Sequence, residues 1–155
     1  LIEDLELRTV KRQYLALVYG NPISGTTLDS PIGRHPKDRR RMAVSDRGKP
    51  AVTHFRLEKR YQFHTLVRVH LETGRTHQIR VHLADAGFPI VGDPLYGGRL
   101  RVPRGASPEL VTMFREFGRQ ALHATELSVT HPESGRRLTW KSLLPNDFRQ
   151  LLEAL

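Results

Sequence analysis

The spacing of apolar and polar positions predicts three strands in the first half of the chain. Residues 13–19 form a short, mostly apolar run that ends in a Gly-Asn-Pro sequence, which is typical of a buried strand followed by a turn. Residues 51–57 and 61–71 are also expected to be strands, and polar and apolar side chains alternate along the second of these runs. Residues 20–50 are rich in glycine and proline, so we expect a long loop or a loose hairpin there.

Helix signals dominate the second half of the chain. A helix is expected to begin at residues 74–76 and to run to about residue 86, where a glycine and a proline follow. Ser107 as N-cap and Pro108 as first helical residue predict a second helix, which ends at a glycine. Asn146 is expected to cap a last helix that runs to the end of the chain.

The remaining pattern completes the fold class. Residues 126–130 and 137–141 flank a Pro-Glu-Ser-Gly segment, which is typical of a β-hairpin. Strands and helices therefore occur in clusters rather than in strict alternation, and this order favours an α+β fold. The 155 residues are enough for one domain with a substantial core, and the sequence contains no repeat or low-complexity segment.

Composition then narrows the classes of function. Lys and Arg total 25 and Asp and Glu total 16, which gives a formal net charge of +9. The chain has no cysteine, so a disulfide framework, a Cys-ligated metal site and a thiol nucleophile are all excluded. There is no long apolar run and no basic-then-apolar opening segment, and we therefore expect neither a membrane span nor a signal peptide.

The excess positive charge lies mostly in two segments, residues 33–49 and 94–108. Charged runs are usually solvated loops. Two basic loops on a domain that is otherwise balanced in charge, however, favour a polyanionic binding partner. We expect this partner to be a nucleic acid rather than a membrane surface. Arginine outnumbers lysine in both segments, which favours forked contacts to phosphate groups. The candidate nucleic-acid-binding residues of these segments are Arg34, Lys37, Arg39, Arg40, Arg41, Arg99 and Arg101.

Residues 72–82 contain the most informative cluster of polar side chains. If the helix begins at residues 74–76, Arg75 and His77 lie in its first turn, where unpaired amides favour an anion, and both become candidates for phosphate contacts. Arg80 lies beside the apolar face of the helix and is expected to pair with a carboxylate or a bound anion. The alternative is that the arginines are surface residues and that His77 and His82 are capping or core residues.

Other catalytic chemistries find little support in the sequence. It has no Walker loop, no dinucleotide-binding glycine pattern after a strand and no G-x-S-x-G elbow. His77 and His82 are five residues apart, which is the wrong spacing for a helical zinc pair, and H-E-x-x-H is absent. We therefore expect no metal site.

Several of these segments together resemble the RluA-type pseudouridine synthases. The matching segments occur in the family's order along nearly the whole chain. They are residues 14–20, 72–82, 91–98, 119–124 and 131–132. Residues 31–54 further resemble a subgroup of this family that modifies uridines in a stem-loop of bacterial 23S ribosomal RNA.

The resemblance implies an isomerase that needs no cofactor. Enzymes of the family detach uracil from ribose C1′, turn the base and rejoin it through C5. The resemblance also implies a mixed, mainly antiparallel sheet flanked by helices, and RNA contacts from the basic residues, Arg75 and His77. We expect a monomeric protein of the cytoplasm that acts on ribosomal RNA and does not associate with membranes. The alternative is a non-catalytic, basic RNA-binding module associated with the ribosome.

Two catalytic positions follow from the resemblance. Arg80 matches the arginine that pairs with the family's catalytic aspartate, and Tyr14 matches the tyrosine that stacks on the target base and takes part in proton transfer. The aspartate belongs to an H-R-L-D-x-x-T-S-G motif that this sequence lacks, and Asp29 is only a superficial mimic. Asp93 belongs to a different motif and is expected to be structural. Residues 1–155 are therefore expected to be the C-terminal part of a catalytic domain, inactive without the upstream aspartate segment.

Overall fold

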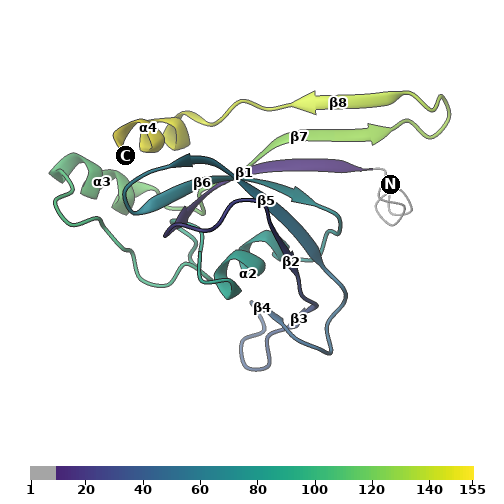
Figure 1. Cartoon of the computed structure of the whole chain (residues 1–155), viewed down its shortest axis with the longest axis horizontal. Coiled ribbons are helices and arrows are strands. Elements are labelled where there is room, and N and C mark those ends of the chain that lie inside the picture. Colours follow the sequence, from purple (N-terminus) through teal and green to yellow (C-terminus); the bar gives the residue numbers. More distant parts are fainter. Residues whose placement is uncertain (1–9) are drawn as a thin grey trace.

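The computed structural model describes residues 10–155 and shows one large sheet with helices packed against it (Figure 1). Its strands are β1 (Lys11–Tyr19), β2 (Thr26–Asp29), β5 (Val52–Arg60), β6 (His64–Leu71), β7 (Leu122–Thr130) and β8 (Arg137–Lys141). They form a six-stranded sheet in the order β2-β5-β6-β1-β7-β8, in which each neighbouring pair is antiparallel. The α+β class and the mainly antiparallel sheet are thus confirmed.

The glycine-rich segment 20–50 is more regular than the sequence suggests. Strand β2 joins the edge of the main sheet beside β5, and β3 (Ile32–Arg34) and β4 (Met42–Val44) form a separate hairpin. The expectation of a long loop or loose hairpin was therefore partly wrong. These strands have only three or four residues each, which is too short for an alternating pattern to be recognised.

Three helices are described: α2 (Gln78–Asp85), α3 (Pro108–Glu116) and α4 (Asn146–Ala154). The predicted cap of α3 is confirmed, because the Ser107 side chain accepts a hydrogen bond from the Leu110 amide. The predicted cap of α4 is wrong by one position: Pro145 is the N-cap, and Asn146 is the first helical residue. Helix α2 begins later than expected, and the reason lies in the turn before it, described below.

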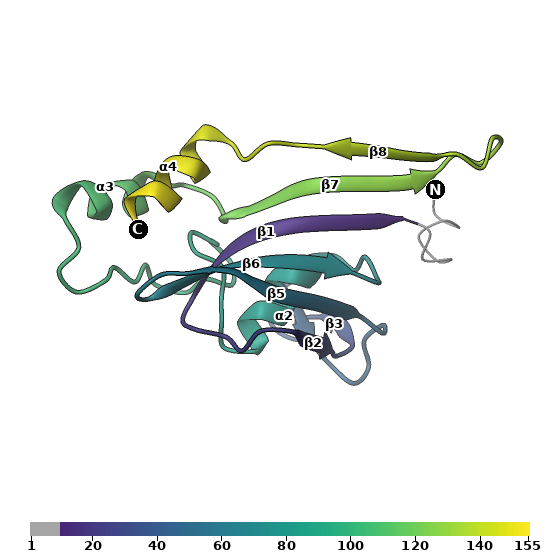
Figure 2. The ribbon, with the colours of Figure 1, turned by 45° about the horizontal axis from the view of Figure 1, so that its top comes forward.

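The helices are divided between the two faces of the sheet. Helix α2 and the β3–β4 hairpin lie on one face, whereas α3 and α4 cover one end of the other face (Figure 2). Phe148 and Leu151 of α4 are fully buried in the main core, and Val81 of α2 packs with Ile32 in a smaller core beneath the sheet. Strand β1 lies in the middle of the sheet, and its second half is buried throughout because both faces are covered there.

The helices of residues 10–155 are short. None of them is long and apolar enough to cross a lipid bilayer.

Candidate active site

The turn between β6 and α2 is held by the side chain of Gln78. Its Oε1 accepts hydrogen bonds from the Arg75 amide at 2.9 Å and the Thr73 hydroxyl at 2.8 Å. Its Nε2 donates to the Val52 carbonyl oxygen and the Thr53 hydroxyl of β5. The backbone of His77 is left-handed, with a φ of 57°, so the chain turns at this residue and α2 begins only after it. The expectation that Arg75 and His77 occupy the first helical turn is wrong: they precede the helix, and Arg75 donates through Nε to the Pro50 carbonyl oxygen.

Arg80 of α2 is buried and paired with Asp93. Its Nε donates to Asp93 Oδ2 at 2.7 Å and its Nη2 donates to Asp93 Oδ1 at 2.9 Å. Arg80 thus pairs with a carboxylate, as expected, but this carboxylate comes from within the chain and occupies one edge of the guanidinium. Asp93 is structural in this pair, as expected, and it also accepts the Leu95 and Tyr96 amides. Burial alone would raise the pKa of Asp93, but these hydrogen bonds, led by the one from Arg80, lower it below its ordinary value.

Asp93 does not use the whole guanidinium of Arg80. In residues 10–155 the Nη1 atom of Arg80 has no hydrogen-bond partner, and the side chain lines a pocket of about 180 Å³. The same pocket is lined by Tyr14, Arg75 and His77, so it brings together four of the residues singled out in the sequence. An arginine that is held on one edge and open on another can bind a second anion without reorienting.

Tyr14 reaches this pocket from β1, in the middle of the sheet. It pairs with Val69 of β6 on one side and with Ala124 of β7 on the other, which fixes its position between two strands. The side chain is half-buried, and its hydroxyl makes no hydrogen bond within the described part of the chain. The pocket therefore offers a flat aromatic surface with a free hydroxyl.

Sequence reasoning did not identify Arg12, which also lines the pocket. Its guanidinium lies directly against the backbone of Gly74, so closely that a Cβ atom at residue 74 would collide with it. The Nε atom of Arg12 is buried and has no partner among residues 10–155. A signal was present: Arg12 and Tyr14 are two residues apart on one strand, so their side chains lie on the same face.

The first basic segment lies beside α2, on the β3–β4 hairpin (Figure 1). Lys37 and Arg39 are exposed, whereas Arg40 forms an exposed ion pair with Asp38. The Arg41 guanidinium lies 5.3 Å from the centre of the Tyr96 ring. The remaining member of this candidate group, Arg34, is exposed and donates to the Arg39 carbonyl oxygen.

The second basic segment follows α2 in the chain and leads to the start of α3 (Figure 1). Arg99 and Arg101 are exposed there, and Arg101 lies over the Tyr19 ring, at the opposite end of β1 from Arg12.

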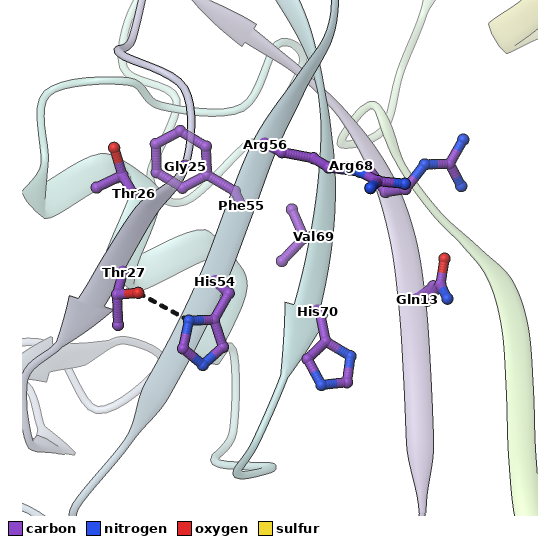
Figure 3. Close-up of a pocket in the computed structure, with 10 residues that line it drawn as sticks. All are labelled: Gln13, Gly25, Thr26, Thr27, His54, Phe55, Arg56, Arg68, Val69 and His70. Atoms are coloured by element: carbon purple, nitrogen blue, oxygen red, sulfur yellow. Dashed lines mark hydrogen bonds between the residues drawn. The ribbon is translucent and has the colours of Figure 1, made fainter.

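A larger pocket, of about 370 Å³, lies on the other face of the sheet (Figure 3). Its walls include His54 and His70, whose rings stack at 6.2 Å, and Arg68. His54 bridges the Thr27 hydroxyl and the Glu72 carboxylate, and Arg68 is paired with a glutamate. None of the residues predicted for the site lines this pocket. Within residues 10–155 there is also no group of three or more His, Asp or Glu side chains that could hold a metal ion.

Comparison with known sequences identifies relatives of the whole chain. A sequence model described as RNA pseudouridylate synthase matches residues 2–85. The protein named ribosomal large subunit pseudouridine synthase D is 55% identical in Pseudomonas aeruginosa and 50% identical in Escherichia coli K12, each over 155 residues. These matches cover 100% of this chain but only 48% of either relative, so the chain spans about half of their length.

Two human proteins of known structure share this fold. Human RNA pseudouridylate synthase domain containing 1 matches with a TM-score of 0.71 and 27% identity, covering 93% of this chain and 58% of that one. Human RNA pseudouridylate synthase domain containing 4 matches with a TM-score of 0.74 and 26% identity, covering 99% of this chain and 65% of that one. The arrangement of sheet and helices is therefore shared along nearly the whole chain.

Proposed function

The chain belongs to the RNA pseudouridylate synthase family, and from this we propose that the full-length protein isomerises specific uridines to pseudouridine in a stem-loop of bacterial 23S ribosomal RNA. Relatives named for the large ribosomal subunit are 50–55% identical over all 155 residues. The observation that carries the proposal is that Tyr14 and Arg80, which come from a central strand and from a helix, line one pocket.

We propose that the nucleophilic aspartate enters this pocket from a segment outside residues 1–155, which would then form the C-terminal part of the catalytic domain. The sequence contains no H-R-L-D motif, and the chain spans about half the length of its relatives. Arg80 is suited to receive this carboxylate because Asp93 fixes one edge of its guanidinium and leaves Nη1 open. A cation within hydrogen-bonding distance of a carboxylate keeps it ionised and would direct it toward C1′ of the ribose.

Tyr14 would hold the target base. A uracil that has been taken out of its stack needs a flat surface to replace its neighbours, and the Tyr14 ring supplies one at the pocket wall. Because the Tyr14 hydroxyl is not engaged by the described residues, it is available for proton transfer when the base is rejoined through C5.

RNA binding would come mainly from the exposed arginines and lysine of the two basic segments, together with Arg75. These side chains add affinity for the phosphate backbone, while the target base is presented from a loop of the RNA. We further propose that the protein acts as a monomer in the cytoplasm and that its partner is ribosomal RNA, not a membrane. The chemistry assigned to the site uses side chains alone and no cofactor.

The direct test is to map pseudouridine by mass spectrometry in the 23S ribosomal RNA of cells that lack the protein. We expect specific pseudouridines to disappear and to return when the full-length protein is supplied, but not when residues 1–155 alone are supplied. Unchanged pseudouridine together with retained ribosome binding would instead support the non-catalytic RNA-binding module. Turnover by residues 1–155 alone would contradict the proposal that the nucleophile lies outside them.

A further inference from the structure

His77 has an unusual backbone conformation at the edge of the pocket. Its φ angle is 57°, and it is the one non-glycine residue with a positive φ within residues 10–155. Side chains other than glycine rarely adopt this left-handed conformation, and it persists only where the surroundings hold it. Here Tyr96 holds it: the Tyr96 hydroxyl is 2.9 Å from His77 Nδ1, and the two rings meet edge to face at 5.6 Å.

The hydrogen bonds of Tyr96 favour one tautomer of the His77 ring. The Tyr96 hydroxyl accepts the Met42 amide of β4 at 2.8 Å. Its single hydrogen has one acceptor within reach in the described structure, which is His77 Nδ1. A neutral imidazole that accepts at Nδ1 must carry its proton on Nε2. Burial and, next, the charge of Arg80 lower the pKa of His77, which keeps the ring neutral at neutral pH.

We propose that His77 is a base-contacting residue of the isomerisation, whose Nε2–H donates a hydrogen bond to a carbonyl oxygen of the target uracil, and that Tyr96 is the positioning residue that fixes this tautomer. The inference rests on the proposed function and deepens it. His77 lines the same pocket as Tyr14, so a base stacked on the Tyr14 ring lies beside the imidazole.

A carbonyl oxygen fits this donor better than a phosphate does. Phosphate groups are best bound by charged, forked donors, and the pocket already contains Arg12 and Arg75 for that purpose. Tyr96 instead makes His77 a neutral donor in a fixed direction, which matches a neutral acceptor such as C2=O or C4=O of uracil. The same hydroxyl ties β4 of the basic hairpin to this donor, so one side chain connects an expected RNA-binding element to the base pocket.

The tautomer can be measured directly by long-range ¹H–¹⁵N NMR on the full-length protein, which distinguishes protonated Nδ1 from protonated Nε2. We expect Nε2–H for His77 in the wild type and a mixture of tautomers in Tyr96→Phe, which keeps the ring but removes the hydroxyl. Tyr96→Phe should also lower kcat by about tenfold with an unchanged Kd for RNA, which is the effect of one neutral hydrogen bond. Tyr61→Phe is the matched control, since the half-buried Tyr61 hydroxyl has no hydrogen-bond partner among residues 10–155.

Two substitutions of His77 distinguish the loss of its hydrogen-bond donor from a disturbance of its backbone conformation. Asparagine tolerates the left-handed conformation well but its amide reaches only to the place of Nδ1, whereas the glutamine amide reaches toward the place of Nε2. We expect His77→Asn to fold normally and to lose about tenfold in kcat, and His77→Gln to recover part of that loss. The test substrates carry sulfur in place of O2 or O4 of the target uridine. In the wild type, one of these two replacements should lower kcat. In His77→Asn the same replacement should cause no further loss of kcat, because the hydrogen bond is already absent.

Three results would overturn the inference. They are a proton on Nδ1 of His77 in the wild type, a wild-type rate in His77→Asn, and a thio effect of equal size in both proteins, which would show that His77 does not contact the substituted oxygen. An active wild type with an unaffected His77→Asn overturns this inference alone. A wild type that forms no pseudouridine overturns the proposed function as well.

Discussion

At the scale of single residues, the Arg80–Asp93 pair combines burial with two parallel hydrogen bonds. Asp93→Ala in the full-length protein should lower the free energy of unfolding by about 3 kcal/mol, because it leaves a buried guanidinium without its carboxylate. Urea denaturation measures this loss. Asp147→Ala is the matched control: Asp147 also forms a two-bond pair, with Arg119, but it is exposed, and its loss should cost about 1 kcal/mol or less. Equal losses in the two variants would contradict a special role for burial.

The function of Arg80 is tested by Arg80→Lys, which keeps the charge near Asp93 but removes the fork. A lysine cannot hold Asp93 through two bonds and offer a third donor in a fixed direction. We expect conversion of uridine to fall by about two orders of magnitude, while Kd for the RNA stem-loop changes by less than about threefold. Single-turnover rates and filter binding measure the two quantities. If affinity fell in proportion to activity, Arg80 would be a phosphate-binding residue and not the partner of the nucleophile.

His64 makes the stability of the protein depend on pH. The ring is buried beside Phe114 and Tyr19, both ring nitrogens lack a partner in the described residues, and burial lowers its pKa to about 4. The unfolded chain binds this proton near pH 6.5, so unfolding takes up a proton between pH 6.5 and 4. The free energy of unfolding should therefore fall as the pH falls through this window, by roughly 3 kcal/mol in total.

His64→Phe provides the control for this pH effect. Phenylalanine keeps an aromatic ring against Phe114 and removes both unpartnered nitrogens, so the variant should be more stable than the wild type at pH 5 and should lose less stability between pH 7 and pH 4. Urea midpoints across this range measure both effects. Parallel pH profiles for the two proteins would show that His64 does not titrate in this window.

The sequence identified the residues that line the pocket better than the side chains to which they are hydrogen-bonded. Tyr14, Arg75, His77 and Arg80 could be singled out because they lie in recognisable segments. The partner of Arg80 could not be, because Asp93 follows a helix and a turn and meets it only in the folded chain. The hydrogen bond between His77 and Tyr96 depends in the same way on tertiary structure.

At the scale of elements, the strands and helices that were predicted well are those with a signal in their own local sequence. The apolar run at β1, the Ser-Pro start of α3 and the turn between β7 and β8 each carry a local cause, and all were predicted close to their observed bounds. The start of α2 was misjudged because His77 adopts a left-handed conformation, which interrupts the helix before Gln78. Gln78 takes the Arg75 amide and anchors itself on β5, and no property of the local sequence reveals that distant anchor.

Gln78 is therefore expected to hold the turn that carries Arg75 and His77. Gln78→Ala removes the hydrogen bond to the Arg75 amide within the turn and the one to the Val52 carbonyl oxygen of β5. We expect a loss of about 2–4 kcal/mol in the free energy of unfolding, together with a lower kcat, since His77 is no longer fixed. The exposed Gln62 supplies a control, and Gln62→Ala should change neither quantity measurably. Full activity in Gln78→Ala would show that the turn keeps its shape without this side chain.

At the scale of the whole molecule, the two faces of the sheet differ in what they offer to RNA. Arg12, Tyr14 and the basic hairpin lie on the α2 face, and α3 and α4 cover part of the other (Figure 2). Adjacent residues of β1 point to opposite faces, so Tyr14 enters the pocket while Gln13 lines the larger pocket of Figure 3. The net charge of the sequence predicted a polyanionic binding partner. Only the fold shows how the basic segments are placed relative to the candidate site.

The contribution of the hairpin can be tested by reversing exposed charges. The double variant Lys37→Glu, Arg39→Glu should bind RNA more weakly. The slope of the logarithm of the association constant against the logarithm of the salt concentration should decrease in magnitude by about 1 for each phosphate that is no longer neutralised. The value of kcat at saturating RNA should stay the same. The control reverses Arg136 and Lys141, which are exposed on the distant β7–β8 hairpin and change the net charge equally. Titrations at several salt concentrations measure both slopes. If both pairs reduced the slope equally, the β7–β8 hairpin would contact RNA as much as the basic hairpin does, because counterions are released only where basic side chains lie against the phosphates.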